Sequence, residues 1–298
     1  MGYSEIALKI FVAQAEGIIK TNAQFWKKFP TREDFEEFVK GDEGFIRTVE
    51  ITSLKLKQEA EKNNKDFNFI CIYDQEFPKI HTKIKRNSEK PYLLFYKGDI
   101  TLLNKINNNI AVIGLIDPDT EIEERERKFV KQLVNQNITI VSGLAKGCDS
   151  IAHKVALENS GRTIAILPST LEKIYPAENK KLAENIVKNK GLLLSEYYHE
   201  PKNKFVAIGR FIERDRLQAL FSKAVILTAS YREGEGDSGS RHAMEAAEKY
   251  NIERFIMYNE QIDNENIKFG LNKDYYHKQI QVLKPKIIEK IINLKTNL

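Results

Sequence analysis

A turn with two glycines and a lysine, within SGLAKGCDSIAH (residues 142–153), has the residue types to bind an anion. It follows ITIV (138–141), which is typical of a buried strand, and precedes a stretch that predicts a helix. A glycine turn between a strand and a helix points backbone N–H groups toward one place, where a phosphate can bind. The candidate phosphate-binding residues here are Ser142, Gly143, Lys146 and Gly147.

The same turn also has a purely structural interpretation. In that case the glycines form the bend, Asp149 or Ser150 caps the helix, and Lys146 is solvated. Spacing alone leaves both interpretations open. His153 lies one turn into the helix, where a packed, hydrogen-bonded histidine is more common than a catalytic one.

Arginines gather in GRFIERDR (209–216), within a predicted helix. Arg210, Glu213 and Arg214 have the spacing that places side chains on one face of a helix, and Arg216 faces elsewhere. These residues can form an exposed ladder of ion pairs. Alternatively, one or two of the arginines bind phosphate in a bidentate manner.

A second candidate cradle lies in REGEGDSGSRHAMEAAE (232–248), after the predicted strand AVILTA. Ser238, Gly239 and Ser240 stand at the start of a predicted helix, where hydroxyls and free amides bind anions. Two such cradles after neighbouring strands are more specific than one. We interpret the upstream Glu233 and Glu235 as residues of a flexible loop tip.

The loop at residues 114–119, after the predicted strand IAVIG, argues against a dinucleotide cofactor. It has one glycine where a dinucleotide site would have GxGxxG, and its carboxylates Asp117 and Asp119 repel phosphate. No cofactor is therefore expected. The sequence also has no GxSxG nucleophile elbow and no HExxH motif, and Cys148 has no evident base, so no catalytic constellation emerges.

The composition is that of a soluble globular protein, with 42% hydrophobic and 30% charged residues. No apolar run is long enough to span a bilayer, and the N-terminus does not read as a signal peptide. Cys71 and Cys148 have no metal-ligand spacing, so we expect no metal and a reducing, cytoplasmic location. A net charge of +5 permits a nucleic-acid partner without requiring one.

Alternating strands and helices must position these loops. Strands without polar alternation are predicted at 110–114, 138–141, 162–167, 192–195, 224–229 and 254–258. Helices are predicted between and after them at 120–136, 149–160, 179–190, 211–222 and 239–250. A capping box of Thr120 and Glu123 marks the start of the first helix. The pattern predicts an α/β fold, a Rossmann-like doubly wound and mostly parallel sheet that binds ligands beyond the carboxyl ends of its strands.

The chain divides into four predicted segments. Residues 1–62 form a small all-α N-terminal domain of three short helices, and the polar stretch 61–66 is the candidate linker. Residues 63–109, with short β-rich runs, form a lead-in to the Rossmann-like domain at 105–262. Residues 263–298 form a tail whose end, IIEKIINLK, predicts one helix.

In their order along the chain, these motifs resemble the DprA/Smf family of DNA-processing proteins. The resemblance rests on SGLAKGCDSIAHKVAL, GRTIAILPSTLEKIYPAEN, GLLLSEY, RFIERDR and DSGSRHAMEAA, with YDQEFPKI and PYLLFYKGD upstream. It covers roughly residues 70–260 and several motifs at compatible spacing, which is far more specific than a single glycine motif.

This resemblance implies a single-stranded-DNA-binding protein of natural transformation. Such proteins protect incoming ssDNA and help load the RecA recombinase; they are binding mediators, not enzymes, and are typically homodimers. The resemblance implies that phosphates meet the two cradles and the three arginines, with Asp149 and His153 in support. Phe211 and Tyr175 are candidate base-stacking residues, although core packing is the more common role of each.

Departures from the family's motifs keep two alternatives open. Gly114-Leu115-Ile116 replaces the family's Gly-Ser-Arg, and Asp215 replaces an asparagine. One alternative is a nucleotide-sensing or nucleotide-binding protein of a defence or regulatory system. A related phosphoribohydrolase is disfavoured, because Ala243 stands where its catalytic glutamate would be. The other alternative is a scaffold that functions through its dimer or partner surface.

Overall fold

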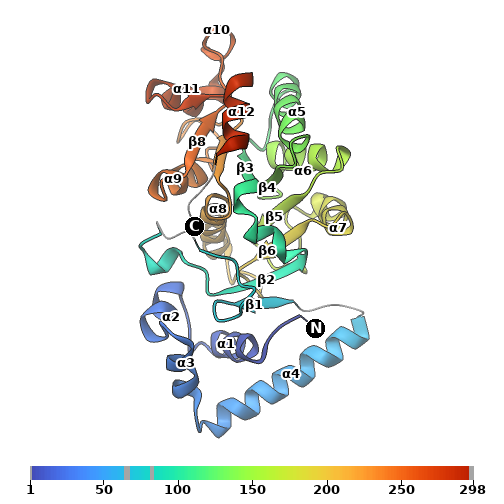
Figure 1. Ribbon diagram of the computed structural model, residues 1–298, viewed down its shortest axis with the longest axis vertical. Helices are drawn as coiled ribbons and strands as arrows, with labels where there is room; N and C mark the ends of the chain where they lie inside the picture. The colour runs from blue at the N-terminus through green and yellow to red at the C-terminus, as the bar shows by residue number, and fades with distance from the viewer. Residues whose placement is uncertain (1, 64–67, 81–83, 295–298) are drawn as a thin grey trace. The chain divides into compact units, whose positions relative to one another are not determined.

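The computed structural model describes residues 2–63, 68–80 and 84–294, and it divides into two compact units (Figure 1). The N-terminal unit is Met1–Lys97 and the C-terminal unit is Gly98–Leu298. The four segments predicted from the sequence divide the chain more finely than this, and their boundaries stay predictions. Within the described ranges, no helix has both the length and the apolar character that crossing a membrane requires.

The N-terminal unit has more helix than the sequence predicts. Instead of three short helices, its described residues form α1 (Glu5–Ala15), α2 (Asn22–Lys28), α3 (Arg32–Val39) and α4 (Glu43–Asn63). The error lies in α4, whose 21 residues continue through the first part of the predicted linker because no proline or glycine interrupts them after Gly44. Residues 64–66 of that linker lie outside the described residues.

Two short strands complete the N-terminal unit. They are β1 (Phe69–Cys71) and β2 (Leu93–Gly98), which pair antiparallel, and a 3-10 turn, η1 (Asn87–Glu89), precedes β2. Aromatic rings form much of the core. The rings of Phe25 and Tyr92 stack with their centroids 4.2 Å apart, and Phe25 is fully buried.

A parallel sheet organises the C-terminal unit and confirms the predicted α/β fold (Figure 1). Its strands are β3 (Asn109–Ile113), β4 (Thr139–Ser142), β5 (Thr163–Leu167), β6 (Leu192–Ser195), β7 (Ala224–Leu227), β8 (Glu253–Ile256) and β9 (Gln281–Val282). They run in the order β6-β5-β4-β3-β7-β8-β9, and each neighbouring pair is parallel. The order reverses between β3 and β7, which is the point where doubly wound sheets bind ligands.

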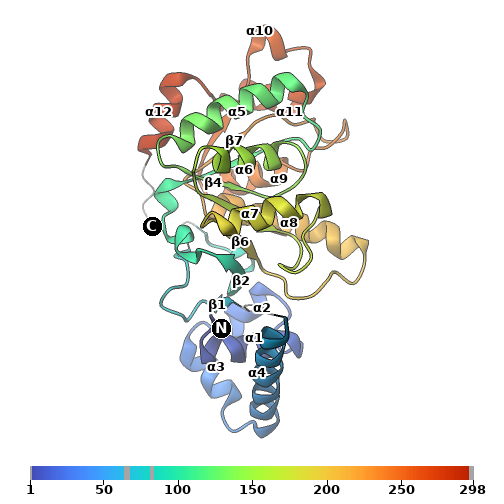
Figure 2. The same cartoon turned by 90° about the vertical axis from the view of Figure 1, so that its right-hand side faces the viewer.

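Helices cover both faces of this sheet, with α5, α6 and α7 in one row and α8 beside α9 (Figures 1 and 2). The helices are α5 (Thr120–Val134), α6 (Cys148–Glu158), α7 (Lys180–Lys188), α8 (Lys204–Leu220), α9 (Arg241–Lys249), α10 (Glu260–Asp263), α11 (Gly270–His277) and α12 (Pro285–Asn293). Short 3-10 turns are η2 (Ile100–Asn104), η3 (Ile106–Asn108), η4 (Ala177–Asn179) and η5 (Ile267–Phe269).

Three local predictions in this unit are wrong. Helix α5 is capped by Asp119, whose carboxylate accepts the N–H of Ile122, and not by Thr120, which is already helical. Helix α8 begins earlier than the predicted residue 211, after the cap Asn203, because Gly209 lies within the helix and does not start it. The tail holds α11 and the strand β9 as well as the predicted helix α12.

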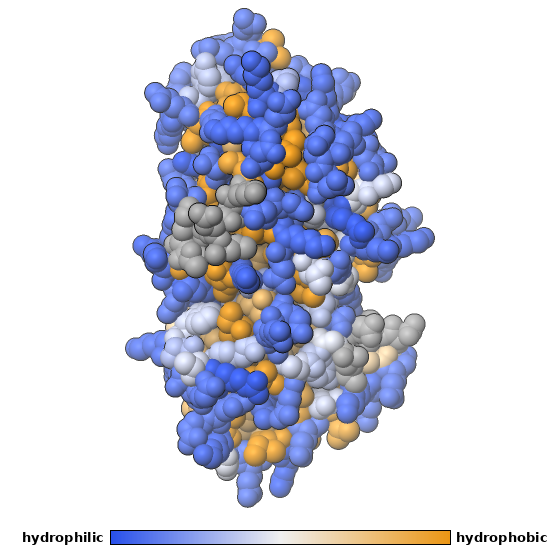
Figure 3. Space-filling model, in the orientation of Figure 1, coloured by the Kyte–Doolittle hydropathy of each residue, from blue (hydrophilic) through white to orange (hydrophobic). Residues whose placement is uncertain are grey.

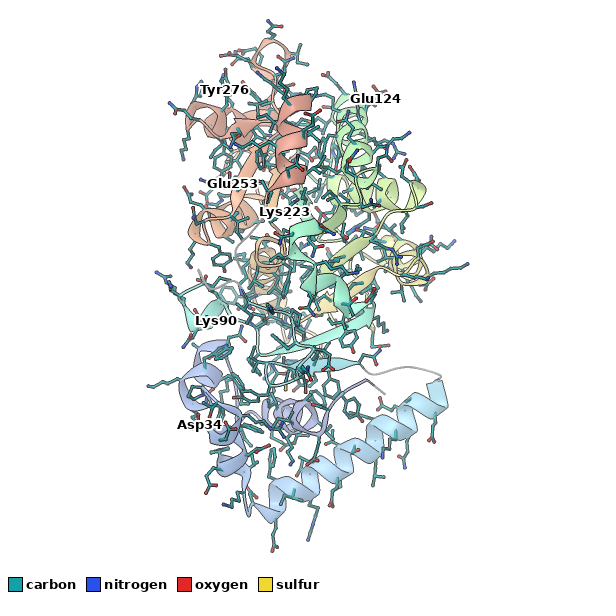
Figure 4. The ribbon with its side chains drawn as sticks, in the orientation of Figure 1. Asp34, Lys90, Glu124, Lys223, Glu253 and Tyr276 are labelled. Carbon is teal, nitrogen blue, oxygen red and sulfur yellow. The ribbon has the colours of Figure 1, made fainter. Side chains whose placement is uncertain are left out.

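A buried lysine holds the end of α12. Lys223, labelled in Figure 4, is 1% exposed and donates a hydrogen bond of 2.7 Å from its Nζ to the carbonyl oxygen of Ile292. Burial lowers the pKa of Lys223 to about 8. Because the last carbonyls of a helix have no partner within it, this ammonium group satisfies an acceptor that the helix itself leaves open.

Candidate nucleic-acid interface

Three loops meet beyond the carboxyl ends of β3, β4 and β7. The N–H of Cys148 donates to the carbonyl oxygen of Leu115 at 2.9 Å, and the N–H of Ile116 donates to Asp237 Oδ2 at 3.2 Å. The loop after β3 therefore contacts both the glycine turn and the start of the second cradle. The structure thus brings the two predicted cradles to one edge of the sheet.

The glycine turn after β4 needs its two glycines for different reasons. Gly147 has a φ of 65° and a ψ of −128°, and a Cβ there would lie 2.3 Å from the carbonyl oxygen of Leu115. Gly143 leaves room for the guanidinium group of Arg214, which a Cβ would meet at 1.1 Å. Leu144 between them also has a positive φ, of 59°, and is fully buried.

Asp149 binds the turn from the inside and does not cap α6. Its Oδ2 accepts the N–H groups of Gly143 and Ala145, each at 3.2 Å. The residue before α6 is Gly147, which has no side-chain cap, so the predicted capping by Asp149 or Ser150 is wrong. The buried Asp149 carboxylate therefore accepts the N–H groups of Gly143 and Ala145 from inside the protein.

Asn179, at the end of η4, fixes the opposite side of the turn. Its Nδ2 donates to the carbonyl oxygen of Leu144 and to Ser150 Oγ, each at 2.9 Å, and approaches the carbonyl oxygen of Ala145 at 3.2 Å. The Ser150 hydroxyl in turn donates to the same Ala145 carbonyl. Sequence reasoning missed Asn179. Its only signal is a short polar residue between a proline and a helix, which is typical of turns in general.

A buried charge cluster supports the turn from below. Arg214 is 5% exposed, lies 3.1 Å from Asp215 and 3.7 Å from Asp149, and so cannot extend into solvent. Burial raises the pKa of Asp149, and raises that of Asp215 to about 7, although Arg214 opposes both shifts. Burial together with Arg214 lowers the pKa of His153 to about 3, and its Nδ1 lies 2.6 Å from Thr163 Oγ1. These residues are structural partners of the turn.

The outer side of the turn presents different chemistry. Lys146 points its ammonium group outward, 2.8 Å from Glu178 Oε2, with its side chain about half exposed at 53%. The Glu178 carboxylate raises the pKa of Lys146. Within the described residues, the N–H groups of Lys146 and Gly147 have no acceptor. A half-exposed cation and two backbone N–H groups without an acceptor therefore lie in this part of the turn, while Ser142 lies inside with its hydroxyl donating to the carbonyl oxygen of Val112.

An exposed aromatic ring stands beside Lys146. Tyr175 is 59% exposed, so its predicted role in core packing is wrong. Its ring contacts the ring of Phe211 edge-on, with centroids 5.7 Å apart, and Phe211 is half-buried above the Arg214 guanidinium. An exposed ring supported from below is a suitable platform for a nucleobase.

The remaining arginines of the predicted cluster are committed to other groups. Arg210 is buried, lies 4.1 Å above the ring of Tyr197, and donates to the carbonyl oxygen of His199 at 2.7 Å. Arg216 binds both carboxylate oxygens of Glu196, each at 2.7 Å. Neither the exposed ion-pair ladder nor a solvent-facing arginine clamp is present, because Arg210 and Arg214 are both buried.

The second cradle uses part of its polar groups within the protein. The hydroxyl of Ser240 donates to the carbonyl oxygen of Gly114 at 2.8 Å, and the N–H of Gly239 donates to Asp237 Oδ1 at 3.3 Å. The carbonyl oxygen of Ser238 accepts the N–H of Arg241. Both predicted glutamates pair with arginines: Glu233 lies 2.6 Å from Arg241, and Glu235 lies 3.8 Å from Arg232.

Acids and thiols near the loops have structural partners. Asp117 accepts a hydrogen bond from Tyr231 at 3.2 Å and lies 3.5 Å from Lys268. Cys148 is fully buried, and burial with the nearby Glu126 carboxyl raises the pKa of its thiol well above the usual range. The described residues contain no group of three or more His, Cys, Asp or Glu side chains placed to hold a metal ion.

The sequence matches the family described as DNA recombination-mediator protein A over residues 68–282. It is similar to Protein Smf of Synechocystis sp., with 32% identity over 67% of this chain and 48% of that protein. It is also similar to DNA processing protein DprA of Streptococcus pneumoniae, with 35% identity over 63% of this chain and 62% of that protein. The chain thus spans about half to three fifths of the length of these relatives.

Two solved structures resemble this fold. The X-ray structure of DprA from Streptococcus pneumoniae aligns over 100% of both chains with a TM-score of 0.73 and 25% identity. A structure of DprA from Helicobacter pylori, described by its single-stranded DNA binding mode, aligns over 76% of this chain and 95% of that chain. Its TM-score is 0.60 and its identity 29%.

Proposed function

The chain belongs to the DNA recombination-mediator protein A family, and from this premise we propose that it binds single-stranded DNA through the glycine turn after β4. In this proposal it acts in the cytoplasm as a binding mediator without catalysis. It protects incoming ssDNA, helps to load RecA recombinase during natural transformation, and works as a homodimer.

The observation that carries the proposal is the outward side of the glycine turn. The ammonium group of Lys146, two free backbone N–H groups and the exposed ring of Tyr175 lie together there. Cations and amides that contact a phosphate backbone, next to a ring on which a base stacks, bind single strands with little sequence preference. The ssDNA-binding relative from Helicobacter pylori supports this assignment.

The same geometry limits which predicted residues contact DNA. Arg210, Arg214 and Arg216 are held by internal partners, and the Ser240 hydroxyl is bonded within the protein. In the proposal these groups shape the site, and Lys146 with the backbone of the turn makes the phosphate contacts. We therefore expect few ionic contacts and a moderate dependence of affinity on salt.

The test is a fluorescence-anisotropy titration of a labelled oligo-dT at several salt concentrations. Lys146→Glu is compared with Lys154→Glu, which reverses another exposed charge, on α6 and away from the turn. We expect Lys146→Glu to weaken binding at least tenfold, corresponding to about 1.4 kcal/mol, and Lys154→Glu to change it little. Duplex DNA should compete poorly. Equal losses in both variants, or no binding at low salt, would refute the assignment.

We propose dimerisation and RecA loading from the family membership alone, and each needs its own measurement. Sedimentation velocity should give the mass of two chains. Addition of the protein should shorten the lag before RecA hydrolyses ATP on protein-coated ssDNA, and Lys146→Glu should restore the lag. A monomer in solution would contradict the first expectation, and an unchanged lag would contradict the second.

A further inference from the structure

A cavity lies in the C-terminal unit, beyond the carboxyl ends of β8 and β9. Its volume is about 610 Å³, within the range of small-molecule sites. Four α5 residues spaced three, four and seven apart form one wall, and hydrophobic residues appear at the surface between α12 and α5 (Figure 3). The α5 wall consists of Arg125, Lys128, Phe129 and Gln132.

One wall of the cavity is rigid. Arg125 makes two hydrogen bonds, of 2.7 and 2.8 Å, to the buried carboxylate of Asp263, and lies 5.1 Å from the centre of the Phe269 ring. Asp263 also accepts the N–H of Asn259 at 2.6 Å. Since Arg125 is neutralised by this partner, it positions the wall and leaves the rim lysines to supply free positive charge.

Aromatic rings line a second side. Tyr276 projects from α11 (Figure 4), donates from its hydroxyl to Glu260 at 3.1 Å, and packs against Tyr258 with centroids 5.1 Å apart. Tyr258 is buried, and its hydroxyl has no hydrogen-bond partner within the described chain. A buried hydroxyl without a partner is unfavourable, and a polar ligand in the cavity could satisfy it.

Two cations stand at the rim with no ion pair within the described residues. They are Lys128 on α5 and Lys284 just before α12, and both are exposed. Apolar groups from Met257, Leu283 and Ile288 complete the lining between them. The lining therefore combines tilted aromatic rings and apolar groups with two unpaired ammonium groups, and its Glu260 carboxylate is bonded by the Tyr276 hydroxyl.

We propose that this cavity binds a nucleoside phosphate, with the base against Tyr276 and the apolar lining and the phosphate between Lys128 and Lys284. A planar aromatic group suits the rings, and an anion suits two unpaired ammonium groups. The ligand is either a free nucleotide or one nucleotide unit of a strand. The site is separate from the glycine turn: three strand spacings, or about 15 Å, lie between β4 and β8 in the sheet.

The test titrates the full chain by isothermal calorimetry with dAMP, dTMP and inorganic phosphate up to millimolar concentrations. The double variant Lys128→Glu/Lys284→Glu is compared with Lys131→Glu/Lys286→Glu, which reverses exposed charges on α5 and α12 outside the cavity. We expect the first pair to weaken nucleotide binding at least tenfold and the second to leave it unchanged. Tyr276→Leu should also weaken nucleotide binding, with no effect on any phosphate binding.

Several outcomes would overturn the proposal: no nucleotide binding at millimolar concentration, equal losses in the two double variants, or phosphate binding as tight as dAMP. A titration with oligo-dT distinguishes the two ligand sources, since only a strand-borne nucleotide would make oligo-dT affinity depend on Lys128 and Lys284.

The variant Lys146→Glu tests whether the cavity and the glycine turn bind independently. If it abolishes oligo-dT binding and leaves dAMP binding intact, the cavity acts independently of the turn. If wild-type protein binds dAMP but no ssDNA, the proposed function fails and this inference stands.

Discussion

The two predicted cradles differ in what their acids do. In the turn after β4, the buried Asp149 accepts the N–H groups of Gly143 and Ala145, and the N–H groups of Lys146 and Gly147 have no acceptor among the described residues. At the start of α9, the Ser240 hydroxyl and the N–H of Gly239 donate within the protein, whereas the N–H groups of Ser238 and Ser240 also have no acceptor among the described residues. A strand–glycine–helix pattern therefore does not decide whether an anion can bind. What distinguishes the first turn is the exposed ammonium group of Lys146 and the exposed ring of Tyr175 near it.

The largest expected difference between the cradles is in pH dependence. Burial raises the pKa of Asp215, beneath the first turn, from 3.8 to about 7. A carboxyl whose pKa is higher in the folded state contributes stability that is complete below pH 4 and is lost as pH rises through 7. The shift corresponds to about 4 kcal/mol across this window. Chemical denaturation at pH 4 to 8 should therefore give a steeper fall in stability for wild type than for Asp215→Asn.

Asp237→Asn, in the second cradle, is the control for that measurement. Its partly exposed carboxylate is the smallest of the causes that raise the pKa of Asp215, so this variant should change the slope much less than Asp215→Asn does. A curve for Asp215→Asn that is as steep as wild type would show that other groups carry the pH dependence.

The next largest effect concerns the glycines. Gly147→Ala places a Cβ 2.3 Å from the carbonyl oxygen of Leu115 at a φ of 65°, so we expect a loss of about 3 kcal/mol in the free energy of unfolding. Gly239→Ala meets only Asp237 Oδ1 at 3.4 Å and should cost less than about 0.5 kcal/mol. Urea denaturation of both variants measures the contrast. Similar losses would mean that the second cradle is as constrained as the first.

Neutralising the internal acid should have a smaller effect. Asp149→Asn keeps the shape but removes a charge beside Arg214 and one acceptor for two N–H groups, so we expect a loss of about 2 kcal/mol at neutral pH. Oligo-dT affinity should also fall, because the turn loses its support. Retained stability with lost affinity would instead indicate that Asp149 acts on the ligand directly.

The smallest effect is expected at Ser240. Ser240→Ala removes one hydrogen bond to the carbonyl oxygen of Gly114 and should cost about 1 kcal/mol in stability. Oligo-dT affinity should not change, because the hydroxyl is used within the protein. A loss of affinity comparable to that of Lys146→Glu would indicate that the second cradle also contacts the DNA.

The sequence predicts the sheet well because buried parallel strands appear as short apolar runs. The predicted strands at 192–195 and 224–229 overlap β6 and β7 closely. Helix starts are predicted less well. Asp119 and Thr120 are both good caps, and only the backbone conformation shows that Asp119 takes that role, while Gly209 suggests a boundary inside a continuous helix.

The sequence predicts where the candidate site lies better than it predicts which residues contact one another there. Helical spacing groups Arg210 with Arg214, but it does not show that the face they share is buried between the helix and the sheet. The roles of Asp149 and Asn179 depend on a turn with left-handed residues, which no periodic pattern encodes. Tyr175 is exposed for a related reason, since loop residues have no period from which burial can be inferred.

Asp149 also has a consequence for the kinetics of association. A turn that is already held by its own carboxylate and by Asn179 needs no rearrangement before a ligand arrives. Its encounter rate should then be limited by diffusion and by opening of the exposed Lys146–Glu178 ion pair, and rearrangement of the turn's backbone should contribute little. Differences among bound strands would arise from how long each remains, so residence times, more than capture rates, would distinguish one sequence from another.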